Sequence, residues 1–344
     1  MTAHKDQKSN EIIGWGLAGA VLSWQLYFRN QKFMVYDSLS NHTTRVAAGM
    51  VNPIVFKRLT KSWNADLLLP YAEKFYSRIE KLLDVNLVSN KSIFRVFASV
   101  EEENNWSSKQ GDERFQRYLE TPTAAEMPSS EFVHSPFGMG KVNTIGSVDT
   151  NLFLDRSKVF FQENNIQFVD EVFKKETLSD NVRYFFCEGT VVSQNPWFKD
   201  LPLKPTHGET LVIETEDLEF EHTVNKNMFL MHIEGNKYRV GATYNWELMD
   251  PIITEDGKLN LQERLAAFTN FKYKIVEHTA GIRPTVKDRR PMLGVHSMQK
   301  NAIVFNGLGT KGVMIGPYYA EHLVRHVFDG EVLESEVDIQ RFQK

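Results

Sequence analysis

Near the start of the chain, three glycines have a spacing suited to binding a diphosphate. Gly14, Gly16 and Gly19 form a G-x-G-x-x-G pattern directly after a short predicted strand that ends in Ile12 and Ile13. The first glycine permits a tight turn, the second lets the backbone approach phosphate oxygens, and the third lets a following helix pack closely on a sheet. The free N–H groups at the start of that helix attract anions. The pattern predicts a dinucleotide site, and the alternative is a glycine-rich turn without a ligand.

The elements needed to position these glycines are predicted on both sides of them. Residues 18–26 carry apolar side chains at helical spacing, and residues 32–36 form a second apolar run. The two runs and the glycines therefore predict strand, helix and strand in succession. Asp37 ends the second strand, where an acid about 20 residues beyond the glycines is the expected partner of a ribose. The alternative is an ordinary surface carboxylate.

Composition and charge exclude several functional classes. The chain has 344 residues, 42% hydrophobic and 24% charged, with a formal net charge of -4. These values are typical of a globular protein of one or two domains, and they give no overall field that would attract nucleic acid or an anionic membrane. The short basic group Lys287, Arg289 and Arg290 is interpreted as a solvated loop.

The termini and the cysteine content bear on the compartment. Cys187 is the only cysteine, so no intrachain disulfide can form, which fits a reducing environment. Residues 1–10 are polar and lack the apolar region of a secretory signal, and no run of about 18 apolar residues could span a membrane. The expected location is the cytoplasm, with no membrane partner.

Apolar spacing along the rest of the chain predicts α/β elements at both ends and in the middle, with antiparallel segments between them. Helices are expected over 66–83, 149–164 and 259–271, and from the glycines at 307–312 to about 328. Strands are expected at 93–98, 166–169, 184–189, 210–214, 228–233, 237–242 and 302–306. This alternation predicts a discontinuous nucleotide-binding domain with a β-rich domain inserted into it.

Three separated stretches together resemble the D-amino-acid oxidase superfamily of flavoenzymes, which includes glycine oxidase and sarcosine oxidase. The first is 14–19 with Asp37, and the second is 45–53. The third is 281–316, which contains G-I-R-P, D-R-R-P-M-L-G and G-L-G-T-K-G. Their order and spacing fit over essentially the whole chain, although Trp15 departs from the small residue often found between the first glycines.

The resemblance implies an α/β fold in which a Rossmann-like FAD-binding domain carries an inserted antiparallel β-sheet substrate domain. It implies that FAD is bound non-covalently. The FAD-binding domain would comprise 9–85, 141–205 and 275–344, and the substrate or cap domain 86–140 and 206–274. The residues that the resemblance assigns to the cofactor are Gly14, Gly16, Leu17, Ala18, Gly19, Asp37, Arg45, Ala48, Gly49, Met50, Asn52, Val172, Glu188, Gly189, Arg283, Gly307, Gly309, Thr310, Lys311, Gly312 and Val313.

Two cations are candidates for catalytic roles. In the family, the arginine of a similar G-I-R-P run grips a substrate carboxylate, and a guanidinium suits this because its fork holds two oxygens at once. The resemblance gives this role to Arg283, and a structural ion pair is the alternative. Negative charge develops toward N1 and the C2 carbonyl when flavin accepts a hydride, and the helix start after Gly309 could stabilise it. Lys311 either adds a full charge there or is a solvated side chain.

Aromatic residues of the inserted sheet are candidates for the wall of the substrate pocket. Tyr244 is expected near the substrate, with His232, Tyr238 and Trp246 as possible companions. An aromatic cage would suit a cationic or methylated amine, whereas ordinary core and surface aromatics are the alternative. His207 is expected to be structural and Cys187 to be buried and unreactive. No group of residues has the spacing of metal ligands.

The expected reaction is oxidation of a C–N bond in a small amine or amino acid. Hydride passes to flavin N5, and the imine formed is hydrolysed by water. The reduced flavin would be reoxidised by oxygen or by another electron acceptor. One alternative is a flavoprotein acting on an aminomethyl-uridine of tRNA, ranked lower because the net charge is -4. The other alternative is a flavin-binding module without catalysis.

Overall fold

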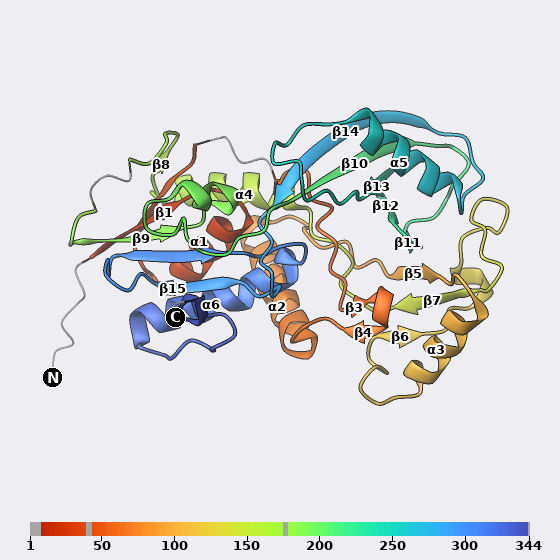
Figure 1. Ribbon diagram of the computed structural model, residues 1–344, viewed down its shortest axis with the longest axis horizontal. Coiled ribbons are helices and arrows are strands. Elements are labelled where there is room, and N and C mark those ends of the chain that lie inside the picture. Colours follow the sequence, from red (N-terminus) through yellow and green to blue (C-terminus); the bar gives the residue numbers. More distant parts are fainter. Residues whose placement is uncertain (1–7, 39–42, 175–177, 343–344) are drawn as a thin grey trace.

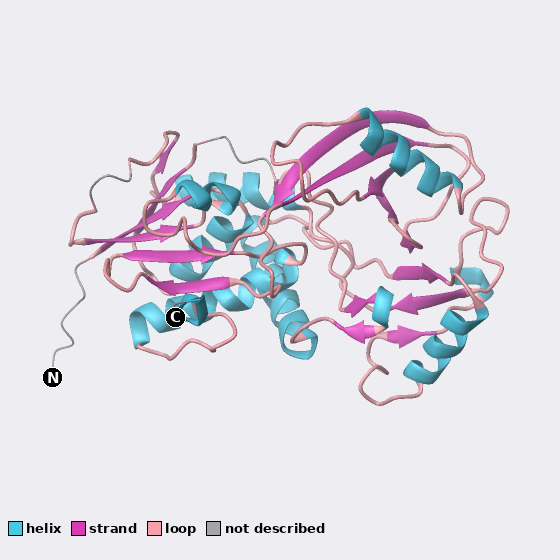
Figure 2. Cartoon of the chain, viewed as in Figure 1, coloured by secondary structure: helices cyan, strands magenta, loops and turns pink. Residues whose placement is uncertain are grey.

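The computed structural model describes residues 8–38, 43–174 and 178–342. Two β-sheets divide the molecule, as Figure 1 shows with one sheet on the left and the other on the right. Most of the helices lie beside the left-hand sheet, and the right-hand sheet is longer and strongly twisted (Figure 2). Most of the polar N-terminal segment discussed above, residues 1–7, lies outside the described residues.

The first sheet has six strands in the order β15-β16-β9-β1-β2-β8. At its centre β1 (Ser9–Ile13) pairs in parallel with β2 (Phe33–Tyr36) and β9 (Val182–Phe186). Strand β1 has few apolar residues, but it can still be buried because its polar Asn10 finds a hydrogen-bond partner. Asn10 donates from Nδ2 to the carbonyl oxygen of Lys32 at 2.8 Å. Helices α1 (Leu17–Phe28) and α6 (Gly312–Asp329) pack against each other and against strands of this sheet.

The second sheet has eight strands in the order β14-β10-β13-β12-β11-β5-β7-β6. Its longest pairing joins β10 (Thr206–Glu214) with β14 (Lys274–Arg283) in antiparallel register. Gly208 lies opposite Gly281, and Arg283 lies opposite Thr206 at the end of the pair. Figure 1 shows this pair running from the eight-stranded sheet back to the junction between the two portions.

The buried apolar side chains form three clusters, the first of which extends from the six-stranded sheet to residues of the eight-stranded sheet such as Ile93 and Val142. Trp24 of α1 is fully buried in the first core and donates from Nε1 to the hydroxyl of Ser157 at 2.8 Å. The second core lies between the eight-stranded sheet and α5 (Glu255–Ala266). The remaining helices are α2 (Ala65–Leu83), α3 (Val100–Gln110) and α4 (Thr150–Glu163), with short 3-10 turns at Phe56–Arg58, Ala124–Glu126, Gly189–Gln194 and Ile339–Phe342. The remaining strands are β3 (Ile54–Val55), β4 (Thr60–Lys61), β5 (Ile93–Val96), β6 (Leu119–Glu120), β7 (Met139–Val142), β8 (Phe168–Val169), β11 (Thr223–Asn225), β12 (Phe229–Glu234), β13 (Lys237–Gly241), β15 (Met292–Val295) and β16 (Ala302–Asn306).

The predicted fold class is confirmed, because the structure combines a mainly parallel sheet under helices with a largely antiparallel second sheet. The expected helix over 259–271 is displaced, since α5 begins at Glu255 and ends at Ala266. Phe268 lies beyond the helix end and is still buried in the core, so the apolar pattern continued past the helix. None of the described helices has both the length and the apolar character needed to cross a membrane.

Candidate active site

A cavity of about 410 Å³ opens where the two sheets meet. Elements of both portions line it: Gly16 and Gly312 come from helix starts of the first, and Gly208 and Arg283 from strands of the second. A concave site lined by several elements in this way is the usual form of a cofactor pocket.

The N-terminal glycine turn is closed so tightly that it tolerates no side chain. Gly14 has a φ of 106°, and its N–H donates to the carbonyl oxygen of Tyr36 at 2.8 Å. A β-carbon on Gly19 would lie 2.0 Å from the carbonyl oxygen of Gly14. Gly14 and Gly19 therefore shape the turn, whereas Gly16 and the next two residues, Leu17 and Ala18, line the cavity.

Two helix N-termini face this cavity from neighbouring positions. Helix α1 begins after Gly16 and α6 begins at Gly312, and a β-carbon on Gly312 would lie 2.7 Å from a methyl carbon of Leu17. A helix cannot satisfy the N–H groups of its own first turn, so both ends favour anionic or carbonyl oxygens. One of these N–H groups, that of Leu17, donates to the hydroxyl of Thr44 at 3.0 Å. The spacing of the glycines did not predict that Thr44 would contact this helix start.

The loop of the second predicted stretch covers one side of the cavity. Ala48, Gly49, Met50 and Asn52 line it. The guanidinium of Arg239, on β13, donates from Nη1 to the carbonyl oxygens of Val46 at 3.1 Å and Ala47 at 3.2 Å. Burial lowers the pKa of Arg239. Arg239 therefore connects the loop to the eight-stranded sheet. The sequence of its strand did not predict this contact.

Arg283 points its guanidinium into the cavity over the backbone of Gly208. A β-carbon on Gly208 would lie 2.1 Å from both terminal nitrogens of that guanidinium. Nη1 donates to the carbonyl oxygens of His207 and Thr243, each at 3.3 Å, and Cζ lies 4.6 Å from the ring centre of Tyr244. Burial lowers the pKa of Arg283. Within the described part of the chain Arg283 forms no ion pair, so a structural salt bridge does not explain this buried cation.

Lys311 also lines the cavity, and of its two alternatives the solvated side chain is wrong. Its Nζ donates to the carbonyl oxygen of Asn52 at 2.6 Å and to the hydroxyl of Ser62. Burial lowers the pKa of Lys311 to about 8, because these partners are neutral and water is excluded. A positive charge is thus available at the start of α6 below this pH.

Burial of this ammonium should make the stability of the protein depend on pH. Lys311 has its usual pKa of 10.5 when unfolded and about 8 when folded. Between these values the unfolded chain binds more protons, so the free energy of unfolding rises with pH. The rise attributable to Lys311 is at most about 3.5 kcal/mol, since one pKa unit corresponds to about 1.4 kcal/mol. Urea unfolding of the cofactor-free protein at pH values below and above this interval measures it.

The matched variant is Lys311→Met, which keeps the length of the side chain and removes the titration. Relative to wild type, this variant should gain stability at the lower pH and lose that advantage at the higher pH. The same dependence on pH in both proteins would mean that Lys311 is not buried as described.

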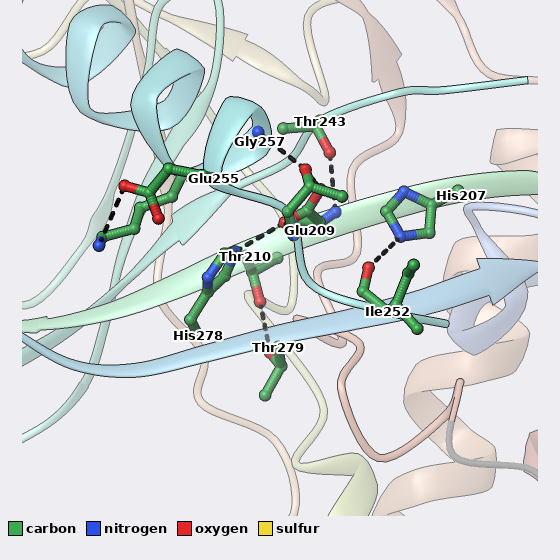
Figure 3. Close-up of polar contacts among 11 residues, drawn as sticks. His207, Glu209, Thr210, Thr243, Ile252, Glu255, Gly257, His278 and Thr279 are labelled. Atoms are coloured by element: carbon green, nitrogen blue, oxygen red, sulfur yellow. Dashed lines mark hydrogen bonds and ion pairs between the residues drawn. The ribbon is translucent and has the colours of Figure 1, made fainter. Parts of the chain in front are cut away.

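A buried carboxylate fixes the segment that carries Tyr244. Figure 3 shows Glu209 of β10 between His278 of β14 and the N-terminus of α5. His278 Nε2 lies 2.7 Å from Glu209 Oε2, and Thr254 donates to Glu209 through its N–H at 2.9 Å and its hydroxyl at 2.7 Å. The hydroxyl of Thr254 also accepts from the N–H of Gly257 and caps α5.

The other end of that segment is anchored to β10 as well. His207 exchanges backbone hydrogen bonds with Asn245, and its Nε2 lies 2.8 Å from the carbonyl oxygen of Ile252 (Figure 3). The segment between Thr243 and Thr254 is thus held at both ends, so Tyr244 lies beside Arg283 in the cavity wall.

The expected aromatic cage is only partly present. Tyr244 lines the cavity, and Trp246 lies near it with ring centres 6.4 Å apart. The expectation for His232 and Tyr238 is wrong, because neither lines the cavity. Tyr238 is buried and donates its hydroxyl to the carbonyl oxygen of Leu218 at 2.5 Å, and His232 Nδ1 lies 2.9 Å from Lys91 Nζ. Their strands place these two side chains on the face of the sheet that points away from the cavity.

The structure brings most of the predicted cofactor residues together but leaves several outside the cavity lining. Gly189, Gly309, Thr310 and Val313 line it together with those already described. The carboxylate of Asp37 lies 4.0 Å from Lys158 Nζ, and Arg45 Nη2 donates to Asp155 at 2.6 Å. Glu188 is buried and accepts from Asn195 at 2.7 Å. Val172, which is 73% exposed, and Gly307 also lie outside the lining, and their roles stay predictions.

Several lining residues were not predicted to line the site. Cys187 is buried as expected and also contributes to the wall. Arg289, interpreted as solvated, belongs to the lining as well. The other unpredicted lining residues include Thr43, Phe56, Thr150, Thr210, Asn225, Phe229, Ala242, Asn306 and Leu308. Among the described residues no group of His, Cys, Asp or Glu could hold a metal ion.

The arrangement fits a flavin dinucleotide. The tight turn at Gly14 and Gly19 brings Gly16, which has no side chain, and the first residues of α1 to the cavity, where phosphate oxygens would approach. The two helix N-termini and the Lys311 cation supply donors to an anion or a carbonyl group. The described lining contains no Asp or Glu that would repel a diphosphate.

Known proteins share this fold over its whole length. A family model described as FAD dependent oxidoreductase, DAO, matches residues 12–326. The crystal structure of glycine oxidase from Bacillus cereus ATCC 14579 superimposes with a TM-score of 0.80 at 14% identity, covering 94% of this chain and 96% of that one. L-proline dehydrogenase from P. horikoshii gives a TM-score of 0.82 at 12% identity, covering 98% of each chain.

In sequence, a glycine oxidase from Geobacillus kaustophilus (strain HTA426) is 24% identical over 145 residues, which are 39% of this chain and 38% of that protein. The aligned part thus spans well under half of this relative. The family model covers far more than half of the chain and agrees with the cavity described above. The chain therefore belongs to the DAO family of FAD-dependent oxidoreductases.

Proposed function

We propose that the protein oxidises the C–N bond of a small amino or imino acid whose carboxylate is bound by Arg283. The observation that carries this proposal is a buried guanidinium in the cavity wall with only carbonyl oxygens as hydrogen-bond partners. A desolvated cation of this kind favours an anion, and its planar fork matches the two oxygens of a carboxylate. Gly208 leaves the space in which the fork lies.

The charge of the cavity narrows the choice of amine. Arg283, Arg289 and Lys311 line it, and the described lining has no Asp, Glu or His. Nearby positive charges disfavour a protonated amine and lower its pKa, so the substrate binds more readily with a neutral nitrogen. This argues against a cationic or quaternary amine held by Tyr244 alone. It also means that no carboxylate or imidazole among these residues is placed to act as a general base.

FAD bound in this cavity would supply the oxidant for the C–N bond, taking up a hydride from the α-carbon and leaving an imine for water to hydrolyse. The residues of this chain position the substrate and exclude water. Arg283 fixes the carboxylate, Tyr244 closes the wall beside it, and the anchored segment beyond Thr243 keeps that wall in place. Lys311 holds positive charge at the start of α6. Oxygen or another acceptor completes the cycle.

We also propose the division of the chain into a FAD-binding part, 9–85, 141–205 and 275–344, and a substrate part, 86–140 and 206–274. The strands of the six-stranded sheet all come from the first set of ranges, which supports the division. Two strands refine its limits. β14 (Lys274–Arg283) belongs to the eight-stranded sheet, and β7 (Met139–Val142) straddles the earlier boundary.

Anaerobic reduction of the FAD-loaded protein tests the proposed reaction. Glycine, sarcosine, proline, aspartate and iminodiacetate are compared with methylamine, dimethylamine and pyrrolidine, which carry primary or secondary nitrogens without a carboxylate. We expect at least one amino acid to bleach the blue flavin absorbance and none of the simple amines to do so. Reduction by the amines as readily as by the amino acids, or by no member of either set, would contradict the proposal.

A further inference from the structure

The cavity holds more positive charge than one carboxylate requires. Its described lining contains Arg283, Arg289 and Lys311 and no acidic side chain. Lys311 is occupied by the carbonyl oxygen of Asn52 and the hydroxyl of Ser62, and Arg283 is the proposed carboxylate partner. The third cation, Arg289, takes part neither in the contacts of Lys311 nor in the proposed binding of the first carboxylate.

The charges beside Arg289 are already paired. Asp288 accepts from Arg341 Nε at 3.0 Å, and Arg290 Nε donates to Glu336 at 3.1 Å. Arg290 also lies over the ring of Trp63, 4.3 Å from its centre. In the described part of the chain Arg289 has no acidic partner, so its charge remains available at the cavity wall.

The loop that carries Arg289 is fixed in place. Thr285 lies 2.8 Å from Thr206 through their hydroxyls, and the N–H of Arg289 donates to the carbonyl oxygen of Val286 at 2.9 Å. Arg289 itself has a φ of 59°, a left-handed conformation that costs a residue with a side chain about 1–2 kcal/mol. Such strained positions concentrate at functional sites.

The two arginines lie on one continuous segment. Arg283 ends β14 and Arg289 follows six residues later, so their Cα atoms are at most about 20 Å apart, and both residues line the same cavity. The guanidinium of Arg283 is largely buried, whereas Arg289 is exposed. A ligand bound to Arg283 could therefore present a second group to Arg289 on the solvent side.

We propose that the substrate carries a second anionic group, which Arg289 binds while Arg283 holds the first carboxylate. The substrate class is then an amino- or imino-dicarboxylic acid. This inference rests on the proposed function and narrows it. A mono-carboxylic substrate would leave Arg289 without a partner.

The test uses unreactive carboxylates that perturb the absorbance of the FAD-loaded protein. Propionate and succinate differ by one carboxylate. We expect wild type to bind succinate about tenfold more tightly, the effect of one charge-assisted contact, and this preference should shrink at high salt. Arg289→Gln should bind both ligands equally, with its affinities for propionate and for FAD unchanged. Lys287→Gln, on the same exposed loop, is the matched control and should keep the preference.

Three outcomes would overturn the inference: equal binding of the two ligands by wild type, a preference that survives Arg289→Gln, or weaker FAD binding in that variant, which would make Arg289 a partner of the cofactor. None of these outcomes contradicts the proposed function as long as propionate binding requires Arg283. Propionate binding unchanged by Arg283→Leu would instead defeat the proposed function.

Discussion

Gly19→Ala is expected to lower the affinity of the protein for FAD by about 100-fold or more. The new β-carbon would lie 2.0 Å from the carbonyl oxygen of Gly14, a separation that no packed structure permits. The turn between these residues must open by about 1 Å, and a displacement of that size costs roughly two orders of magnitude in a preorganised site. Flavin fluorescence quenching on titration with the cofactor-free protein measures the affinity.

Gly111→Ala is the matched control for this experiment. Gly111 ends α3 with an ordinary φ of -72°, and a β-carbon there would have its closest neighbour at 3.6 Å. It should leave FAD affinity unchanged. Circular dichroism of both variants separates loss of binding from loss of folding. A folded Gly19→Ala protein that binds FAD as tightly as wild type would show that the cofactor does not use this turn.

Arg283→Leu should reduce kcat/KM for amino-acid substrates by about 100-fold or more while FAD remains bound. Truncating one partner of a desolvated, hydrogen-bonded charge pair costs about 2–5 kcal/mol. The substitution keeps an apolar side chain of moderate size in the wall beside Tyr244 and removes only the cation. Anaerobic reduction rates and the wavelength shift caused by an unreactive carboxylate measure the loss.

Two companion variants separate the charge of Arg283 from its geometry. Arg283→Lys keeps the charge but loses the fork, so it should recover only part of the activity. Gly208→Ala keeps the arginine and places a β-carbon 2.1 Å from both terminal nitrogens of its guanidinium, so it should raise KM without removing any charge. Turnover at the wild-type rate in Arg283→Leu would remove Arg283 from substrate binding.

Those parts of the site that depend on local sequence could be predicted. Gly14, Gly16 and Gly19 follow a fixed spacing because one turn must meet both phosphates and a helix. Arg283 stands in a short motif at the end of a strand. The apolar spacing predicted helices over 66–83 and 149–164, and α2 (Ala65–Leu83) and α4 (Thr150–Glu163) confirm them.

The remainder depends on contacts between distant segments. Strand β14 (Lys274–Arg283) was not predicted, because its exposed first half is charged and only its pairing with β10 (Thr206–Glu214) makes it a strand. Arg239 lies in β13, yet its partners belong to the loop at Val46 and Ala47. Arg289 looked like a surface residue until its loop was folded against the cavity. No spacing within a strand or loop encodes such partners.

The most direct test of the account is a crystal structure of the protein grown with excess FAD and an unreactive carboxylate. The account predicts FAD density in the cavity, with its diphosphate at Gly16, Leu17 and Ala18, and the carboxylate against the guanidinium of Arg283. A cavity that is empty or filled by side chains under these conditions, or a carboxylate bound away from Arg283, would contradict it.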